Sequence, residues 1–116
     1  MNGPRTGHHV LQLALLLLAL PAGVRADEAD GAALVVEKRC VACHHETGAL
    51  LGPPYMAIAA RHAARKDVMV DVLAEKIIRG GAGNWGVVPM VPNDHVTAEE
   101  ARAMARWILG LRQGGS

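Results

Sequence analysis

Apolar residues recur every three to four positions over most of the chain, which is the spacing of helices with one buried face. We find no convincing alternation of apolar and polar residues of the kind that predicts a half-buried strand. Gly80-Gly81 ends the third helical pattern, and Thr97-Ala98-Glu99-Glu100 is a capping box that begins the last. The sequence therefore predicts an all-α fold with about four short helices, over residues 29–40, 55–65, 67–79 and 97–112.

A long loop separates the last two predicted helices. Residues 80–96 contain four glycines and two prolines, which leave little room for regular structure. The loop also carries Trp85, Val87, Val88, Met90 and Val91, and is too apolar to remain free in water. Long loops of this kind are often functional, so we expect it to pack against another group.

The first 26 residues have the pattern of a secretory signal peptide. Arg5 precedes an apolar run from Val10 to Leu20, and Val24-Arg25-Ala26 fits the small-residue rule for cleavage. The run is shorter than the ~20 apolar residues that a membrane helix needs, although an uncleaved anchor is the alternative. We therefore predict an exported single domain, residues 27–116, with no stable membrane insertion after cleavage.

The composition of residues 27–116 excludes some classes of protein. All eleven acidic and ten of the twelve basic residues lie there, so the net charge is about −1 with histidine neutral. No basic patch indicates a nucleic acid partner. Tyr55, Trp85 and Trp107 are the only aromatic residues of the chain, and no phenylalanine is present. Because small domains with thin cores usually need a disulfide, a metal or a cofactor, we expect a bound group to complete this core.

The segment Cys40-Val41-Ala42-Cys43-His44 contains both cysteines of the chain and has the C-x-x-C-H pattern of covalent haem c attachment. Two thiols three residues apart on a helical turn can both reach one edge of the porphyrin, and the next residue can place an imidazole beneath the iron. The alternatives are a redox dithiol, a structural disulfide, and a zinc site completed by His62 or His95. Only the haem and zinc interpretations give His44 a role.

The second axial ligand of the iron is sought among four methionines. Met104 lies on the apolar stripe of the last helix, and Met56 and Met69 lie on other predicted helices. Met90 instead lies in the long loop between Pro89 and Val91-Pro92, where rigid prolines can hold an extended segment. Met90 is therefore the predicted ligand, with a bis-histidine centre using His62 or His95 as the alternative.

Residues 32–112 resemble the class I c-type cytochromes of the small bacterial cytochrome c-551 kind. The resemblance rests on Cys40–His44, on Gly52-Pro53-Pro54-Tyr55, on the segment from Trp85 to Asn93, and on Ala105-Arg106-Trp107-Ile108-Leu109. It implies short helices wrapped around one haem, with Cys40 and Cys43 as thioether anchors and His44 and Met90 as iron ligands. It also implies that the Pro53 carbonyl accepts a hydrogen bond from His44. Trp85 would donate to a haem propionate, and Asn93 would bond near the Met90 sulfur.

Three positions depart from the family pattern. Leu34-Val35-Val36 stands where the first helix often has a phenylalanine, so Trp107 must fill more of that crossing. Arg39 stands where the family commonly has glycine. Lys76 replaces a propionate-binding arginine, which puts that contact in doubt and makes Arg79 a second candidate.

The resemblance implies a periplasmic, monomeric carrier of single electrons between respiratory proteins, and not an enzyme. Low net charge argues against strong electrostatic steering, so we expect weak docking at the exposed haem edge through an apolar surface. This surface, called the apolar rim below, consists of Val41, Ala42, Leu50, Leu51, Val87, Val88, Pro89 and Val91. The alternatives are a haem subunit of a larger periplasmic oxidoreductase and a peroxidase or gas-binding protein with an open distal site.

Overall fold

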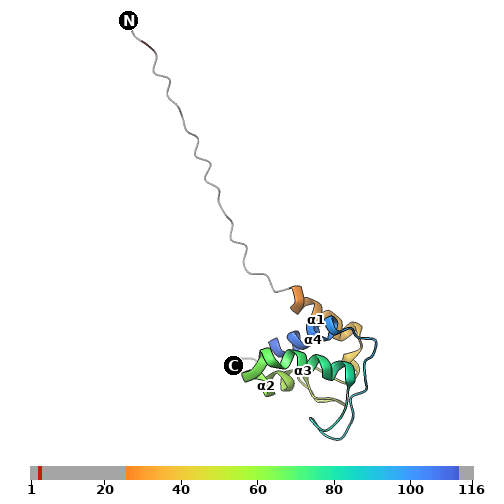
Figure 1. The fold of residues 1–116 in the computed structure, drawn as a ribbon. Coiled ribbons are helices and arrows are strands. Elements are labelled where there is room, and N and C mark those ends of the chain that lie inside the picture. Colours follow the sequence, from red (N-terminus) through yellow and green to blue (C-terminus); the bar gives the residue numbers. More distant parts are fainter. Residues whose placement is uncertain (1–2, 4–25, 113–116) are drawn as a thin grey trace.

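A computed structural model describes residue 3 and residues 26–112 of the chain. The elements run in the order α1 (Ala26–Glu37), η1 (Cys40–Ala42), α2 (Tyr55–Arg61), η2 (Ala63–Arg65), α3 (Lys66–Arg79) and α4 (Ala98–Gly110) (Figure 1). The proposed signal peptide, residues 1–26, lies outside the described residues except for Gly3 and Ala26, and it stays a prediction. No helix in the described part of the chain is long and apolar enough to cross a membrane.

The predicted all-α architecture is confirmed, because residues 26–112 form four α-helices and no strand. The first helix ends three residues earlier than expected. Arg39 adopts a left-handed conformation with φ 64°, which interrupts the helix before Cys40, so that Cys40–Ala42 forms a separate 3₁₀ turn. The second helix stops at Arg61, and the rest of its predicted length becomes the short turn η2.

The capping box at the start of α4 forms as the sequence predicts. The Thr97 hydroxyl accepts from the Glu100 backbone N–H at 3.2 Å, and the Glu100 carboxylate accepts from the Thr97 N–H at 3.0 Å. The other carboxylate oxygen of Glu100 lies 2.9 Å from Nζ of Lys38, just after α1. The cap therefore also joins the start of α4 to the segment that leads into the cysteines.

Helix α4 is the centre of the fold, and α1, α2 and α3 all pack against it. Its apolar stripe is buried, and Met104 has no exposed surface, so its predicted role as a core residue is confirmed. Among the residues whose burial the structure describes, five of the fourteen buried apolar residues are alanines, which lets the helix axes lie close together.

The crossing of α1 and α4 shows how the missing phenylalanine is replaced. Gly31 lies against the Trp107 side chain and the Ala103 carbonyl, with no space for a β-carbon. Val35 is buried in the same crossing. The Trp107 and Tyr55 rings meet edge to face, with 5.3 Å between their centroids. The close approach at Gly31 thus compensates for the smaller side chains of the first helix.

Candidate functional site

The two cysteines lie on the 3₁₀ turn that follows Arg39. The Cys43 and His44 N–H groups both donate to the Cys40 carbonyl, at 3.1 and 3.0 Å, which fixes this turn. Both thiols are free and partly buried. Burial raises the pKa of the Cys40 thiol, whose sulfur lies 4.0 Å from the sulfur of Met104. The turn holds the two sulfurs three residues apart, beside the core.

The other interpretations of the cysteine motif find no support in residues 26–112. The cysteines are not joined in a disulfide, and the part of the chain described contains no strand for a thioredoxin-like unit. No three histidine, cysteine, aspartate or glutamate side chains lie close enough there to share a metal ion. The zinc site with His62 or His95 is therefore not formed.

His44 is held in one orientation by Pro53. The distance between Nδ1 of His44 and the Pro53 carbonyl oxygen is 2.7 Å. Because a carbonyl only accepts, Nδ1 carries the proton and donates, which leaves the lone pair of Nε2 for a metal. The structure therefore contains the hydrogen bond that the resemblance implied, in the tautomer that an axial ligand requires.

Two neighbours support the His44 ring from its sides. The Tyr55 ring stacks on it at 5.6 Å between centroids with 20° between planes, and Gly52 touches the imidazole directly. The loop is tied back to the cysteine turn, since the Gly52 N–H donates to the Cys43 carbonyl at 2.8 Å and the Tyr55 N–H to the His45 carbonyl at 2.9 Å. Sequence reasoning gave Tyr55 no role at the site, although its place directly after Gly52-Pro53-Pro54 was the available signal.

Tyr55 is also one of the most buried polar residues near the site. Its hydroxyl group is inaccessible and has no hydrogen-bond partner in the described residues, and burial raises its pKa well above the usual range. A neutral phenol at this position is compatible with an apolar ring packed nearby.

Met90 is fixed through its backbone at the base of the loop 80–96. Its N–H donates to the Gly81 carbonyl at 2.9 Å, and its carbonyl accepts from the Gly81 N–H at 2.8 Å. Gly80, at φ 66°, lies so close to the Met90 carbonyl that a β-carbon there would clash. The end of α3 therefore determines where the backbone of Met90 lies.

Asn93 and Trp85 are the other predicted site residues of this loop, and the structure shows their contacts with other residues of the chain. The Asn93 amide donates to the Ile77 carbonyl at 2.8 Å and to the Val91 carbonyl at 3.3 Å, which docks the loop on α3. Trp85 is 45 % exposed and has the Arg61 guanidinium over its ring. Bonding of Asn93 near the Met90 sulfur and of Trp85 to a propionate stays a prediction.

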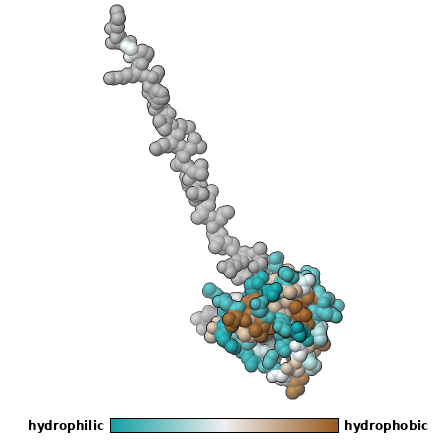
Figure 2. All heavy atoms as spheres, viewed as in Figure 1, coloured by the Kyte–Doolittle hydropathy of each residue, from teal (hydrophilic) through white to brown (hydrophobic). Residues whose placement is uncertain are grey.

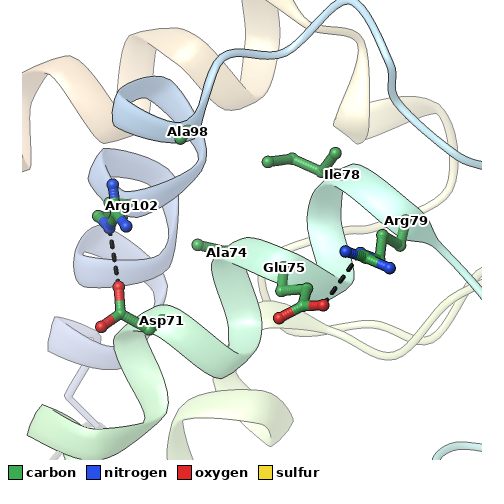
Figure 3. A pocket seen from close by; sticks show the side chains of 7 residues that line it. All are labelled: Asp71, Ala74, Glu75, Ile78, Arg79, Ala98 and Arg102. Atoms are coloured by element: carbon green, nitrogen blue, oxygen red, sulfur yellow. Dashed lines mark hydrogen bonds and ion pairs between the residues drawn. The ribbon is translucent and has the colours of Figure 1, made fainter.

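Lys76 and Arg79 are the two candidates for a contact with a haem propionate. Arg79 forms an ion pair with Glu75 at 2.9 Å and lines a surface pocket of about 280 Å³ between α3 and α4 (Figure 3). Lys76 instead donates to the Gly80 carbonyl at 3.2 Å, next to the base of the loop that carries Trp85 and Met90. Of the two, Lys76 is the one beside the candidate site.

Large apolar side chains are exposed on the loops that carry these residues. Within the apolar rim, Val87 is 92 % exposed, Val91 68 % and Leu51 66 %. Figure 2 shows hydrophobic atoms at the lower tip of the molecule, where Figure 1 places the loop between α3 and α4. A sulfur pair, an imidazole with a free Nε2 and exposed apolar loops fit a covalently attached porphyrin, which such surfaces can cover.

The comparisons with known proteins agree with this site. The model of the cytochrome c family matches residues 28–112. Cytochrome c-552 of Hydrogenobacter thermophilus is 47 % identical over 79 residues, covering 68 % of this chain and 79 % of that protein. Cytochrome c-551 of Ectopseudomonas mendocina is 44 % identical over 84 residues, which are 72 % of this chain and all of that protein.

Solved structures give the same result for the fold. The crystal structure of Nitrosomonas europaea cytochrome c552 superposes with a TM-score of 0.66 at 42 % identity, covering 70 % of this chain and 99 % of that one. Cys40, Cys43 and His44 are thus positioned for the attachment of haem c. The chain belongs to the cytochrome c family and is a class I c-type cytochrome of the c-551 type.

Proposed function

We propose that this monohaem cytochrome carries single electrons between redox proteins in the periplasm, with His44 and Met90 as axial ligands of the iron. The observation that carries the proposal is the fixed backbone of Met90, paired with Gly81 at 2.8 and 2.9 Å and confined by Gly80. A thioether carried on a backbone fixed in this way would suit an iron that keeps both ligands in its two oxidation states.

His44 and the loop 80–96 have separate roles in the proposed electron transfer. Bound haem supplies the one-electron iron couple. His44 offers Nε2 in a fixed orientation, because its Nδ1–H is bound to Pro53 and its ring is stacked on Tyr55. With haem bound, the loop 80–96 would carry Met90 to the iron and would limit the access of water and small ligands to it. A site that is closed on both sides favours electron transfer over peroxidase or gas-binding chemistry.

The apolar rim is the proposed docking surface for redox partners. Val41 and Leu50 from the cysteine side and Val87 and Val88 from the loop 80–96 are all exposed. Weak, small interfaces are typical of electron-transfer pairs. Electron transfer to a small redox protein should therefore change little between low and moderate salt. A sharp loss of the rate with added salt would overturn the docking proposal.

The ferric absorption spectrum tests the ligand set. The protein should show the weak red band of iron–methionine bonding, and Met90→Ala should abolish it. Met56→Ala, which changes a partly buried methionine on α2, is the matched control and should keep the band. A native protein without the band, or one that binds carbon monoxide readily when reduced, would contradict the closed carrier.

The proposed location needs a separate measurement. Expression of the full chain in a bacterium with haem c maturation should place haem-staining protein in the periplasmic fraction, beginning at residue 27. A chain lacking residues 2–25 should stay in the cytoplasm without covalent haem. Haem-loaded protein from that shortened chain would refute the signal peptide.

A further inference from the structure

The loop 80–96 is held by hydrogen bonds at its base, whereas its tip has little packing of its own. At the base, Asn93 docks on the last turn of α3, and Gly81 pairs with Met90. At the tip, Gly83 and Gly86 have positive φ values of 98° and 124°, and a β-carbon on either would meet nothing within 4 Å. Val87 and Val88 are exposed. The tip therefore needs an external contact to stay in one place.

Arg61, the last residue of α2, supplies such a contact. Its Nη1 donates to the Asn84 carbonyl at 2.7 Å, and its guanidinium lies 4.6 Å from the centre of the Trp85 ring. A planar guanidinium can make both contacts at once, whereas an ammonium group can only replace one of them well. One side chain thus joins the end of α2 to two successive residues of the tip.

We propose that Arg61 is a positioning residue that latches the tip of the loop 80–96 onto α2 and so keeps Met90 from moving. The proposal rests on the proposed function, because Met90 must be an iron ligand for its movement to matter. Met90 follows Trp85 by five positions, and the tip and the Met90 backbone belong to one continuous loop. Once the tip opens, the Met90 backbone keeps the two Gly81 hydrogen bonds and the Asn93 dock but loses the support of the tip.

The consequence is kinetic. An external ligand such as imidazole reaches the iron only after the Met90 sulfur has moved away. Without Arg61 the open form of the loop is more populated, so imidazole binding to the ferric protein is faster. Loss of one exposed cation–π contact and one hydrogen bond raises that rate about threefold to tenfold.

The test compares haem-loaded Arg61→Met, Arg61→Lys and Arg65→Met with the native protein. Arg65 is an exposed arginine four residues further along, so Arg65→Met removes the same charge as Arg61→Met and leaves the tip contacts intact. Imidazole binding should be faster in Arg61→Met, close to native in Arg65→Met and intermediate in Arg61→Lys. Amide hydrogen exchange should also be faster at Gly83, whose N–H bonds the Gly86 carbonyl, in Arg61→Met alone.

The outcomes separate the latch from the ligand set. One outcome is that Arg61→Met and Arg65→Met bind imidazole at equal rates while the native protein shows the iron–methionine band. This result would refute the latch and would leave the proposed iron ligands unaffected. If the native protein lacks the iron–methionine band, the ligand proposal fails. Hydrogen exchange at Gly83 then tests whether Arg61 holds the tip of the loop. Faster exchange in Arg61→Met still supports a contact that holds the tip, and unchanged exchange refutes it.

Discussion

Gly52 lies directly against the imidazole of His44, and no β-carbon fits between them. Pro53 and Tyr55 also hold the ring, so a shift away from a new β-carbon would disturb these two contacts. Gly52→Ala should therefore destabilise the haem-loaded protein by about 1–3 kcal/mol, the usual cost of overpacking. Denaturant unfolding measures this change.

Gly48 provides the matched control for that substitution. A β-carbon at Gly48 would have only an ordinary contact, 3.9 Å from Nδ1 of His45. Gly48→Ala should leave the free energy of unfolding within about 0.5 kcal/mol of the native value. Equal losses in both variants would show that Gly52 matters for loop conformation and not for the His44 ring.

A second prediction concerns the crossing of α1 and α4. In an exposed helix, replacing glycine with alanine stabilises by about 0.5–1 kcal/mol. At Gly31 the new methyl group would meet the Trp107 side chain and the Ala103 carbonyl. We expect Gly31→Ala to destabilise by about 1–3 kcal/mol instead, as measured by thermal or denaturant unfolding. A stabilised variant would mean that the helices do not approach as closely as described.

Arg39 should be a site where stability can be gained. Its φ of 64° is unfavourable for any residue with a β-carbon. Arg39→Gly should stabilise the protein by about 0.5–1 kcal/mol, since glycine adopts this conformation readily. Arg39→Ala removes the same charge but keeps the strain, and should give no gain. If both variants are stabilised alike, loss of charge and not relief of strain is the cause.

The cap of α4 predicts a pH dependence. The hydrogen bond from the Thr97 backbone and the nearby Lys38 lower the pKa of Glu100 from its ordinary value of 4.5. A carboxyl group with a lowered pKa in the folded state stabilises the protein above its unfolded pKa, and this contribution disappears as the pH falls through the folded pKa. Stability should therefore drop below about pH 4.5, and Glu100→Gln should reduce that drop.

Unfolding midpoints between pH 7 and pH 3 measure the effect. Glu99→Gln is the control, because Glu99 lies in the same first turn of α4 but has no part in the capping box. It should keep the acid-induced loss of the native protein. A Glu100→Gln variant with the full native loss would show that other carboxyl groups are responsible.

Sequence reasoning predicted the features that depend on local pattern. The four helices, the capping box, the buried Met104 and the haem attachment motif all follow from spacing within one turn or two. It missed the early end of α1, because an arginine rarely adopts a left-handed conformation. The glycine that the family commonly has at this position was the available signal. It also missed the contact of Arg61 with Asn84, which joins residues 23 positions apart and depends on how α2 meets the loop. The ligand role of Met90 stays a prediction.

The alanines that line α4 limit how this protein can evolve. Ala101 and Ala105 are completely buried, so a larger side chain at either position would push neighbouring helices apart, and glycine would weaken the helix. Neither substitution can be compensated by one nearby change, because α4 touches three helices at once. Mutations that alter redox behaviour or partner choice should therefore accumulate on the loops, while the inner face of α4 stays almost unchanged.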